Sequence, residues 1–144
     1  MSVDLYCADQ VTVIFGVVKI DGYAPDSFVK VERNEDAFSL KIGADGEPVR
    51  TRSLNKSGKV TLTLLQTSKT NPLLQALELA DELSNNGVSV LPVMVKDSGG
   101  NALWVAAEGW ITKPAATEAA RESGTREWVI ECAKLLPPIP SLGL

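Results

Sequence analysis

The chain has 144 residues, of which 44% are hydrophobic and 22% are charged, which fits a single domain that can bury a core without a metal or a disulfide. It contains no histidine, which excludes catalysis by a histidine base, histidine-ligated zinc and imidazole pH switches. The 14 basic and 18 acidic residues give a net charge of −4, and this balance disfavours binding to duplex nucleic acid through its phosphates.

The cysteines and the N-terminus indicate where the protein is made. Cys7 and Cys132 form no CxxC pair, so we expect buried, reduced side chains in a cytoplasmic protein, with a disulfide between the terminal segments as the alternative. The first residues lack the basic and apolar segments of a secretion signal. The longest apolar run, Val13–Val18, has six residues, whereas a membrane helix needs about 20. We therefore expect no membrane contact.

Strand patterns dominate the chain. β-branched runs and alternation of apolar with polar residues predict strands over Val11–Ile20, Phe28–Arg33, Val60–Leu64, Val88–Lys96, Ala102–Lys113 and Thr125–Leu135. Pro92 cannot donate a backbone hydrogen bond, which places its strand at a sheet edge or a bulge. A turn over 98–101 predicts a hairpin between the fourth and fifth strands. Prolines exclude regular structure from the C-terminal tail, residues 136–144.

One helix is predicted over residues 72–84. Asn71 is a favourable N-cap, Pro72 fits the first helical turn, and residues 85–87 end the helix. Its apolar stripe is predicted to contain Leu73, Leu74, Leu77, Ala80 and Leu83.

The end of this helix carries Glu78, Asp81 and Glu82 and no cation. Acidic residues near a helix C-terminus oppose the helix dipole by about 0.3–1 kcal/mol each. These three helix-corner acids therefore indicate either a solvated face or a basic partner from outside the chain.

No pattern in the sequence points to catalysis, a cofactor or a metal. The glycine-rich segments 43–46 and 98–100 match no nucleotide-binding motif and are predicted to be turns. Asp45 has too few acidic neighbours for a calcium site. We expect a protein that is not an enzyme.

The segment 34–59 is predicted to form a long protruding arm. It has two extended stretches around the 43–46 turn, with Phe38, Leu40 and Ile42 alternating with polar residues. Each stretch of about 12 residues spans roughly 40 Å, comparable to the diameter of about 37 Å expected for the whole domain. Such an arm is expected to reach another subunit, and head-to-tail contacts of this kind build rings or filaments. The alternative is a hairpin packed on its own sandwich.

Charge is segregated along the arm. Residues 32–47 include five acids and two bases, whereas residues 50–59 include four bases and no acid. We therefore predict that Arg50, Arg52 and Lys56 pair with the helix-corner acids of a neighbour. The residues predicted to bridge subunits are Glu35, Asp36, Phe38, Leu40, Ile42, Asp45, Arg50, Arg52 and Lys56. The predicted fold class is mainly β, an antiparallel β-sandwich or barrel with one flanking α-helix and this protruding β-hairpin arm.

Several segments make the chain similar to the tail tube proteins of tailed phages, over roughly Val11 to Ala133. They are Phe28–Phe38, Gly43–Glu47, Thr51–Ser53, Gly58–Thr67, Asn71-Pro72 and Thr125–Trp128. The resemblance implies a tube subunit of a contractile-tailed phage that forms stacked hexameric rings around a DNA channel, with a fold related to type VI secretion tubes. It also implies sheath, baseplate, tape-measure and terminator partners. The expected location is the virion tail, after assembly in the host cytoplasm.

An acidic channel wall would let DNA pass without specific binding, because basic walls would hold its phosphates. In the last predicted strand, Glu127 and Glu131 lie opposite the apolar side that holds Trp128. The two sides of the strand 102–113 also differ in character. One side is apolar and the other is mixed: Leu103, Val105, Ala107 and Ile111 against Trp104, Ala106, Glu108 and Trp110. We predict that Glu127, Glu131 and Glu108 face the lumen. The alternative is that this face meets the sheath or an adjacent subunit.

Two other functions stay open at this point. One is another ring-forming protein, such as a secretion-system tube or a tail terminator. The other is a small β-barrel that binds single-stranded nucleic acid, which would need a basic groove with aromatic platforms. The chain has three Trp, two Tyr and three Phe, and we expect Trp104, Trp110 and Trp128 in the core or at an interface.

Overall fold

The structure is a computed structural model that describes residues 11–24, 29–96, 102–117, 119, 121–122 and 124–137, with the backbone alone for 102 and 103. Its elements are β1 (Thr12–Phe15), β2 (Val18–Lys19), β3 (Val29–Arg33), β4 (Phe38–Ile42), β5 (Pro48–Arg52), β6 (Gly58–Leu65), α1 (Thr70–Leu83), β7 (Leu91–Lys96), β8 (Ala102–Ile111), β9 (Thr125–Cys132) and β10 (Leu135–Leu136). Cys7, the predicted turn 98–101 and residues 138–144 lie outside the described residues.

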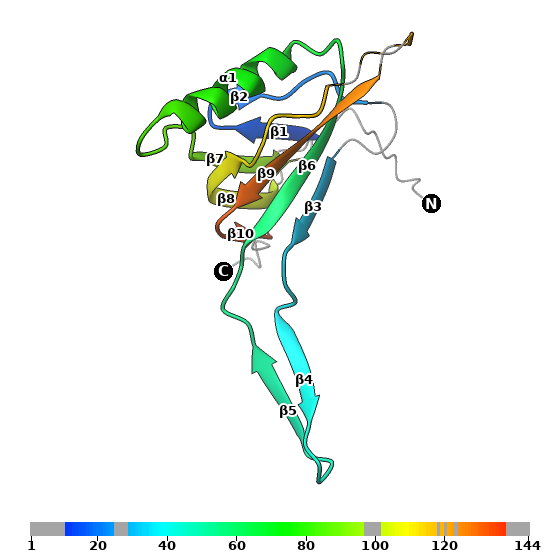
Figure 1. Ribbon diagram of the computed structural model, residues 1–144. Helices are drawn as coiled ribbons and strands as arrows, with labels where there is room; N and C mark the ends of the chain where they lie inside the picture. Colours follow the sequence, from blue (N-terminus) through cyan, green and yellow to red (C-terminus); the bar gives the residue numbers. More distant parts are fainter. Residues whose placement is uncertain are drawn as a thin grey trace, which may run out of the picture.

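The body is one antiparallel sheet in the order β2-β1-β7-β8-β9-β6-β3, with β10 paired to β8. The sheet curves into two layers, with β1, β7 and β8 in one layer and β9, β6 and β3 in the other (Figure 1). β8 pairs with β7 along most of its length and with β9 only over Gly109–Ile111, so it connects the layers. The predicted antiparallel β-sandwich with a flanking helix is confirmed.

The core lies between the two layers. β6 alternates so that Val60 and Leu62 point inward, and β9 does the same with Trp128 and Ile130. Trp128 is the largest fully buried side chain, which confirms the predicted apolar side of the last strand. Cys132 is a free buried thiol whose pKa is raised to about 11 by burial, so it packs as a small apolar residue, as expected.

Two predicted strands are each divided in the structure. Val11–Ile20 is a hairpin, because Gly16 adopts a φ of 64° and lets β1 turn into β2. A Cβ at Gly16 would also lie 2.8 Å from Leu91 Cδ1, so only glycine fits without strain. The last predicted strand stops at Cys132, and the chain resumes pairing at Leu135 to form β10.

A bulge changes the predicted faces of β8. Between the pairs Val93–Ala106 and Leu91–Gly109 the register shifts by one residue, which agrees with the bulge expected at Pro92. The prediction placed Ile111 with Val105 and Ala107, but this was wrong. Ile111 and Ala106 are buried, whereas Val105, Ala107 and Glu108 are exposed, because the extra residue reverses the alternation.

The helix is confirmed, but it begins earlier and faces differently than predicted. It spans Thr70–Leu83, with Lys69 and not Asn71 at the N-cap position. Asn71 is buried, donating to the carbonyls of Leu65 (2.9 Å) and Gln66 (3.2 Å) and accepting from Trp128 Nε1 (2.9 Å). These bonds fix the rotation of α1, since they hold one residue of its first turn against β9.

That rotation buries Asn71, Leu74 and Glu78 against the body. Two leucines of the predicted apolar stripe consequently lie at the surface, with Leu73 52% and Leu83 77% exposed. The stripe was misplaced because its spacing was counted from apolar residues alone, whereas the helix buries a polar Asn and a Glu.

In the folded chain, Asn71→Ala would leave the Trp128 indole N–H and two backbone carbonyls without these partners. Each unsatisfied buried group costs about 1–3 kcal/mol, so we expect the free energy of unfolding to fall by about 3 kcal/mol in urea denaturation. The control is Asn86→Ala in the exposed loop after α1, which should change it by less than about 0.5 kcal/mol. Equal stability of the two variants would contradict the anchoring role of Asn71.

Candidate assembly surface

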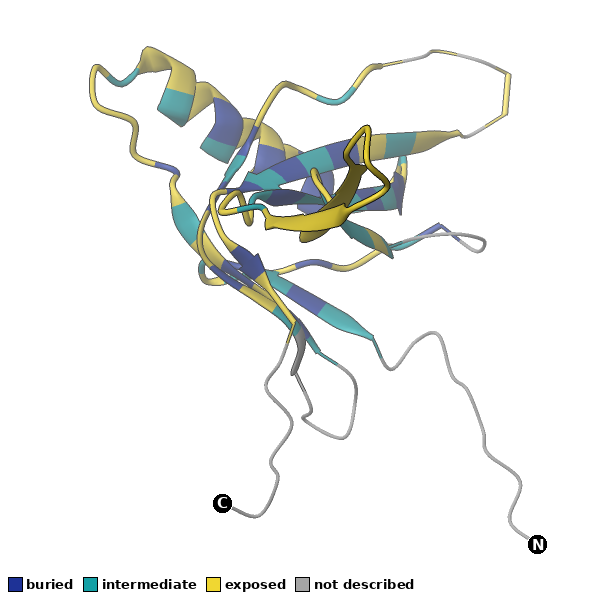
Figure 2. Cartoon of the chain, turned by 90° about the horizontal axis from the view of Figure 1, so that it is seen from below, coloured by how far each residue is buried: buried dark blue, intermediate teal, exposed yellow. Residues whose placement is uncertain are grey.

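The arm is a two-stranded ribbon that continues β3 and β6 away from the body (Figure 1). β4 and β5 pair from Phe38–Arg52 to Ile42–Pro48, and every residue of both strands is exposed. The exposed ribbon is also visible in Figure 2. The alternative of a hairpin packed on its own sandwich was therefore wrong. An isolated two-stranded hairpin is marginal in water at best, which makes this exposed ribbon the candidate surface for contact with another molecule.

The register gives the ribbon two different faces. Residues directly opposite each other on paired strands share a face, so one face, here called the arm face, holds Phe38, Leu40, Ile42, Pro48, Arg50 and Arg52. The Arg50 guanidinium lies over the Phe38 ring, 4.4 Å from its centroid. The opposite face holds Ser39, Lys41, Val49 and Thr51. The arm face thus combines apolar and cationic groups, which sequence alternation alone did not reveal.

The tip and root of the arm are fixed by local hydrogen bonds. At the tip, Asp45 Oδ1 accepts from the Glu47 N–H at 3.2 Å, so Asp45 serves the turn. At the root, Asn34 Nδ2 donates to Glu131 Oε1 at 2.6 Å, and Ser53 Oγ donates to Glu35 Oε2 at 3.0 Å. The Asn34 bond ties the arm to β9, whereas the Ser53 bond joins the two limbs of the arm at its root.

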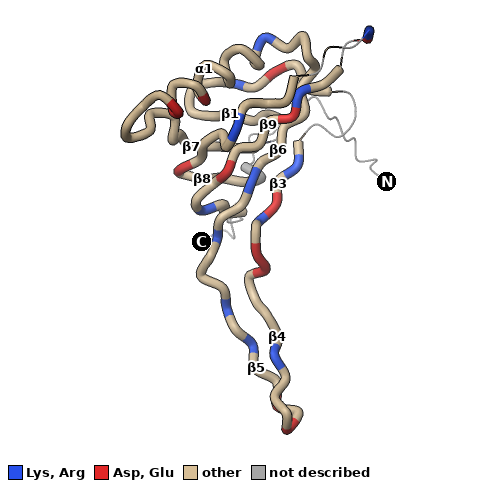
Figure 3. Tube along the Cα trace, viewed as in Figure 1, with Lys and Arg blue, Asp and Glu red and all other residues tan. Residues whose placement is uncertain are grey.

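The cations of the arm are available to a partner. Figure 3 shows basic residues along the limb that contains β5. Arg50, Arg52 and Lys56 are exposed, and over the described part of the chain the ion pair that forms is Lys30–Glu32 at 3.8 Å. Asp36 is also exposed. The two arginines therefore have no carboxylate partner among the described residues of their own chain.

The three helix-corner acids do not lie together at the surface. Glu78 is 2% exposed, with Oε2 lacking a hydrogen-bond partner. Burial, together with the neighbouring Glu82, raises the pKa of the Glu78 carboxyl above its ordinary 4.5. Asp81 Oδ1 accepts from the Val88 (3.0 Å) and Ser89 (3.2 Å) N–H groups and so holds the loop after α1. Of the three, Glu82 alone is fully exposed.

Of the acids predicted to face the lumen, Glu127 and Glu131 lie on the outer side of the β9 layer. The registers align Trp110, Glu131, Lys59 and Glu32 in one row across β8, β9, β6 and β3. Glu127 is exposed four residues before Glu131 on β9, and Glu108 is exposed at the bulge of β8. The face therefore mixes acids with lysines, and Glu131 is already occupied by Asn34. Its orientation toward a lumen stays a prediction.

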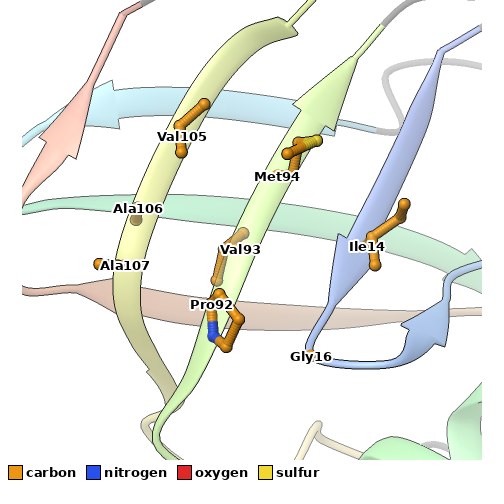
Figure 4. A pocket seen from close by; sticks show the side chains of 8 residues that line it. All are labelled: Ile14, Gly16, Pro92, Val93, Met94, Val105, Ala106 and Ala107. Atoms are coloured by element: carbon orange, nitrogen blue, oxygen red, sulfur yellow. The ribbon is translucent and has the colours of Figure 1, made fainter. Parts of the chain in front are cut away.

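A shallow apolar groove of about 230 Å³ lies on the outer side of the other layer (Figure 4). The registers align Ile14, Met94, Val105 and Leu136 across β1, β7, β8 and β10. The groove offers no group for chemistry. Among the described residues no three His, Cys, Asp or Glu side chains cluster as metal ligands, and no helix there is long and apolar enough to cross a membrane.

The tryptophans do not form a platform for stacking bases. Trp128 is buried, and Trp104 packs against the core from a half-buried position. Trp110 is half-buried beside Glu131. The expected placement of Trp128 in the core is confirmed, and that of Trp104 against the core also holds.

Comparison with known proteins identifies the family of this chain. The chain matches the family model for the Bacteriophage PhiTE tail tube protein over residues 11–136. The chain belongs to this tail tube family. It is also 29% identical over 131 residues to "Structural protein ORF10" of Pseudomonas phage KPP10, covering 87% of this chain and 76% of that protein. This tube protein is thus a structural component of the virion and not an enzyme, as the resemblance implied.

Solved structures share the fold of the tube protein. The tube-terminating cap of the anti-feeding prophage has a TM-score of 0.58 at 9% identity, over 97% of this chain and 95% of that one. The sheath/tube terminator of an extracellular contractile injection system, PVC, has a TM-score of 0.61 at 11% identity, over 96% of this chain and 100% of that one. A chain of the PVC sheath-tube complex has a TM-score of 0.59 at 13% identity, over 90% of this chain and 88% of that one. Identities this low show a common fold alone.

The buried Glu78 makes stability depend on pH. Its carboxyl has a higher pKa in the folded chain than in the unfolded one, so the folded state keeps a proton that the unfolded state releases, and stability falls as pH rises above the ordinary value of 4.5. Glu78→Gln removes this loss of stability, because glutamine has no carboxyl group to titrate. We expect the variant to exceed the native chain in urea resistance at about pH 8 and to match it near pH 4.

The matched control for this comparison is Glu122→Gln, at an exposed position, which should follow the native chain at both pH values. A Glu78→Gln variant with the same stability difference at both would show that the carboxyl does not titrate on unfolding.

Proposed function

We propose that this chain is the repeating subunit of a phage tail tube, and that it assembles as stacked hexameric rings around a channel through which DNA passes. The observation that carries the proposal is the arm, a ribbon exposed on both faces that leaves a body with a complete core. Membership of the tail tube family supports it. Sheath, baseplate, tape-measure and terminator proteins are the partners of such a tube.

The arm supplies the contact between subunits. Leu40 is 67% exposed and Ile42 62% exposed, and fully burying one such side chain contributes about 1.5–3 kcal/mol. Ion pairs at an exposed site add only about 0.2–1 kcal/mol each. Apolar contact therefore provides most of the binding energy, and the arginines select the partner surface. A contact between an arm and a different surface of the next copy repeats without limit unless a ring closes.

A terminator is the second candidate, because two of the structures that share the fold are a tube cap and a sheath/tube terminator. The two functions differ in the length of the assembly, since a tube subunit polymerises and a terminator stops at one ring. Negative-stain images of the purified protein distinguish them directly. The tail tube family favours the tube.

Replacing Phe38–Ser53 by a short Gly-Ser connector should abolish long tubes, because it removes the whole arm face. Sedimentation velocity measures the loss, with urea unfolding to show that the body still folds. The matched control is Lys41→Ser combined with Thr51→Ser on the opposite face of the ribbon, which should leave the sedimentation profile unchanged. Long tubes formed by the armless variant would refute the bridging role.

For the channel wall, Glu127 is a cleaner test than Glu131, since Glu131 is held by Asn34 at the arm root. Glu127→Lys should leave tubes able to form but make them retain DNA in co-sedimentation at low salt, because a basic wall attracts phosphates. Glu122→Lys carries the same charge change at another exposed site and serves as control. A Glu127→Lys protein that cannot assemble would place this side chain in a subunit contact and not in the lumen.

A further inference from the structure

Helix α1 packs one side against the body, yet it also exposes leucines to solvent on its other side. Leu73 is 52%, Leu79 47% and Leu83 77% exposed, and Ala76 and Ala80 between them are exposed as well. These five residues recur at helical spacing and form one stripe, here called the α1 outer face. An apolar stripe on the outside of a helix that already packs against a sheet is typical of a surface with a partner.

The charges beside the C-terminal part of this stripe are acidic, whereas Lys69 is exposed at its N-terminal end, one helical turn before Leu73. α1 contains Glu78, Asp81 and Glu82 and has no basic residue in its last turn. The exposed Glu82 lies one helical turn from Leu79 and next to Leu83, so its carboxylate borders the stripe. The C-terminal part of the α1 outer face is therefore apolar with an anionic edge at Glu82, whereas the arm face is apolar with two arginines that have no carboxylate partner among the described residues. The two surfaces of the same chain are complementary in both respects.

The other exposed apolar surface lacks this complementarity. The row of Ile14 and Met94 on the outer side of the sheet is bordered by Lys19, which pairs with Ile14, and by Lys96, two residues from Met94 on the same face. Lysines at that border would repel Arg50 and Arg52. Between the two apolar surfaces, charge selects α1 for the arm.

The placement of the two surfaces in the fold suits a repeating contact. Figure 1 shows α1 at the end of the body opposite to the end from which the arm leaves. A second copy displaced along the arm thus turns its α1 end toward the arm of the first. The bond from Asn34 to Glu131 ties the root of the arm to the body.

We propose that the α1 outer face of one copy receives the arm face of another, with Leu73, Leu79 and Leu83 covering the apolar side chains of the ribbon and Glu82 meeting its arginines. This inference rests on the proposed function, since it names the surface on which the bridging arm docks. It also gives the exposed leucines of the helix a partner.

Disulfide trapping tests the contact between copies. In a Cys7→Ser background, a Leu40→Cys chain is mixed with a Leu79→Cys chain and oxidised; Cys132 is fully buried and does not interfere. We expect a cross-linked dimer at about tenfold or higher yield than from Leu40→Cys mixed with Val105→Cys, the matched control on the lysine-bordered surface. Equal trapping at Val105, or none at Leu79 in mixtures that form tubes by electron microscopy, overturns the inference and leaves the proposed tube intact.

A charge exchange tests the polar edge of the same contact. Glu82→Lys, and separately Arg50→Glu, should each raise the protein concentration needed for assembly about two- to fivefold, as expected for an exposed ion pair. The two changes combined in one chain should restore assembly at the protein concentration that the native chain needs. Additive losses without rescue would exclude this pairing. Trapping at Leu79 by a protein that forms neither rings nor tubes would instead retain the contact and contradict the proposed function.

Discussion

A two-stranded ribbon has no interior, and this constraint organises the rest of the molecule. β4 and β5 bury none of their residues within the chain, so backbone pairing and exposed cross-strand contacts such as Arg50 over Phe38 hold them together, and an isolated ribbon of this kind is marginal in water. The chain compensates in two ways. It extends the ribbon from β3 and β6, which are fixed in a complete sheet, and it fastens the root through Asn34 and Glu131. In the proposed assembly, contact with another copy adds further stabilisation.

The body is stabilised differently, by a core that lies between two layers and contains Trp128. The indole N–H of this side chain must find an acceptor when it is buried, and it finds Asn71 on the helix. One buried hydrogen bond therefore sets the rotation of α1. The consequence reaches the surface, because the same rotation turns Glu78 inward and leucines outward. An interior polar contact in this way determines what the outside of the molecule presents.

The structural relatives fit this division between body and surface. Caps, terminators and tubes share the fold at identities of 9–13%, so the layered sheet with its helix is a scaffold that tolerates nearly complete replacement of its residues. A fold of this kind does not by itself specify length of assembly or partner. In the proposed assembly, those properties depend on the arm, the exposed face of α1 and the charges around them.

The sequence by itself determined the strands, the helix, the arm and the absence of catalytic chemistry, because period-2 alternation, turn glycines and residue types are local properties. The faces of β6 and β9 also followed from alternation. Only the tertiary structure decided which side of α1 is buried, since that depends on a bond between Asn71 and Trp128, which are 57 positions apart. It also decided the faces of β8, where one bulged residue reverses the alternation. The arm face could not be seen from sequence because it combines residues of two strands, and their register is set only when they pair.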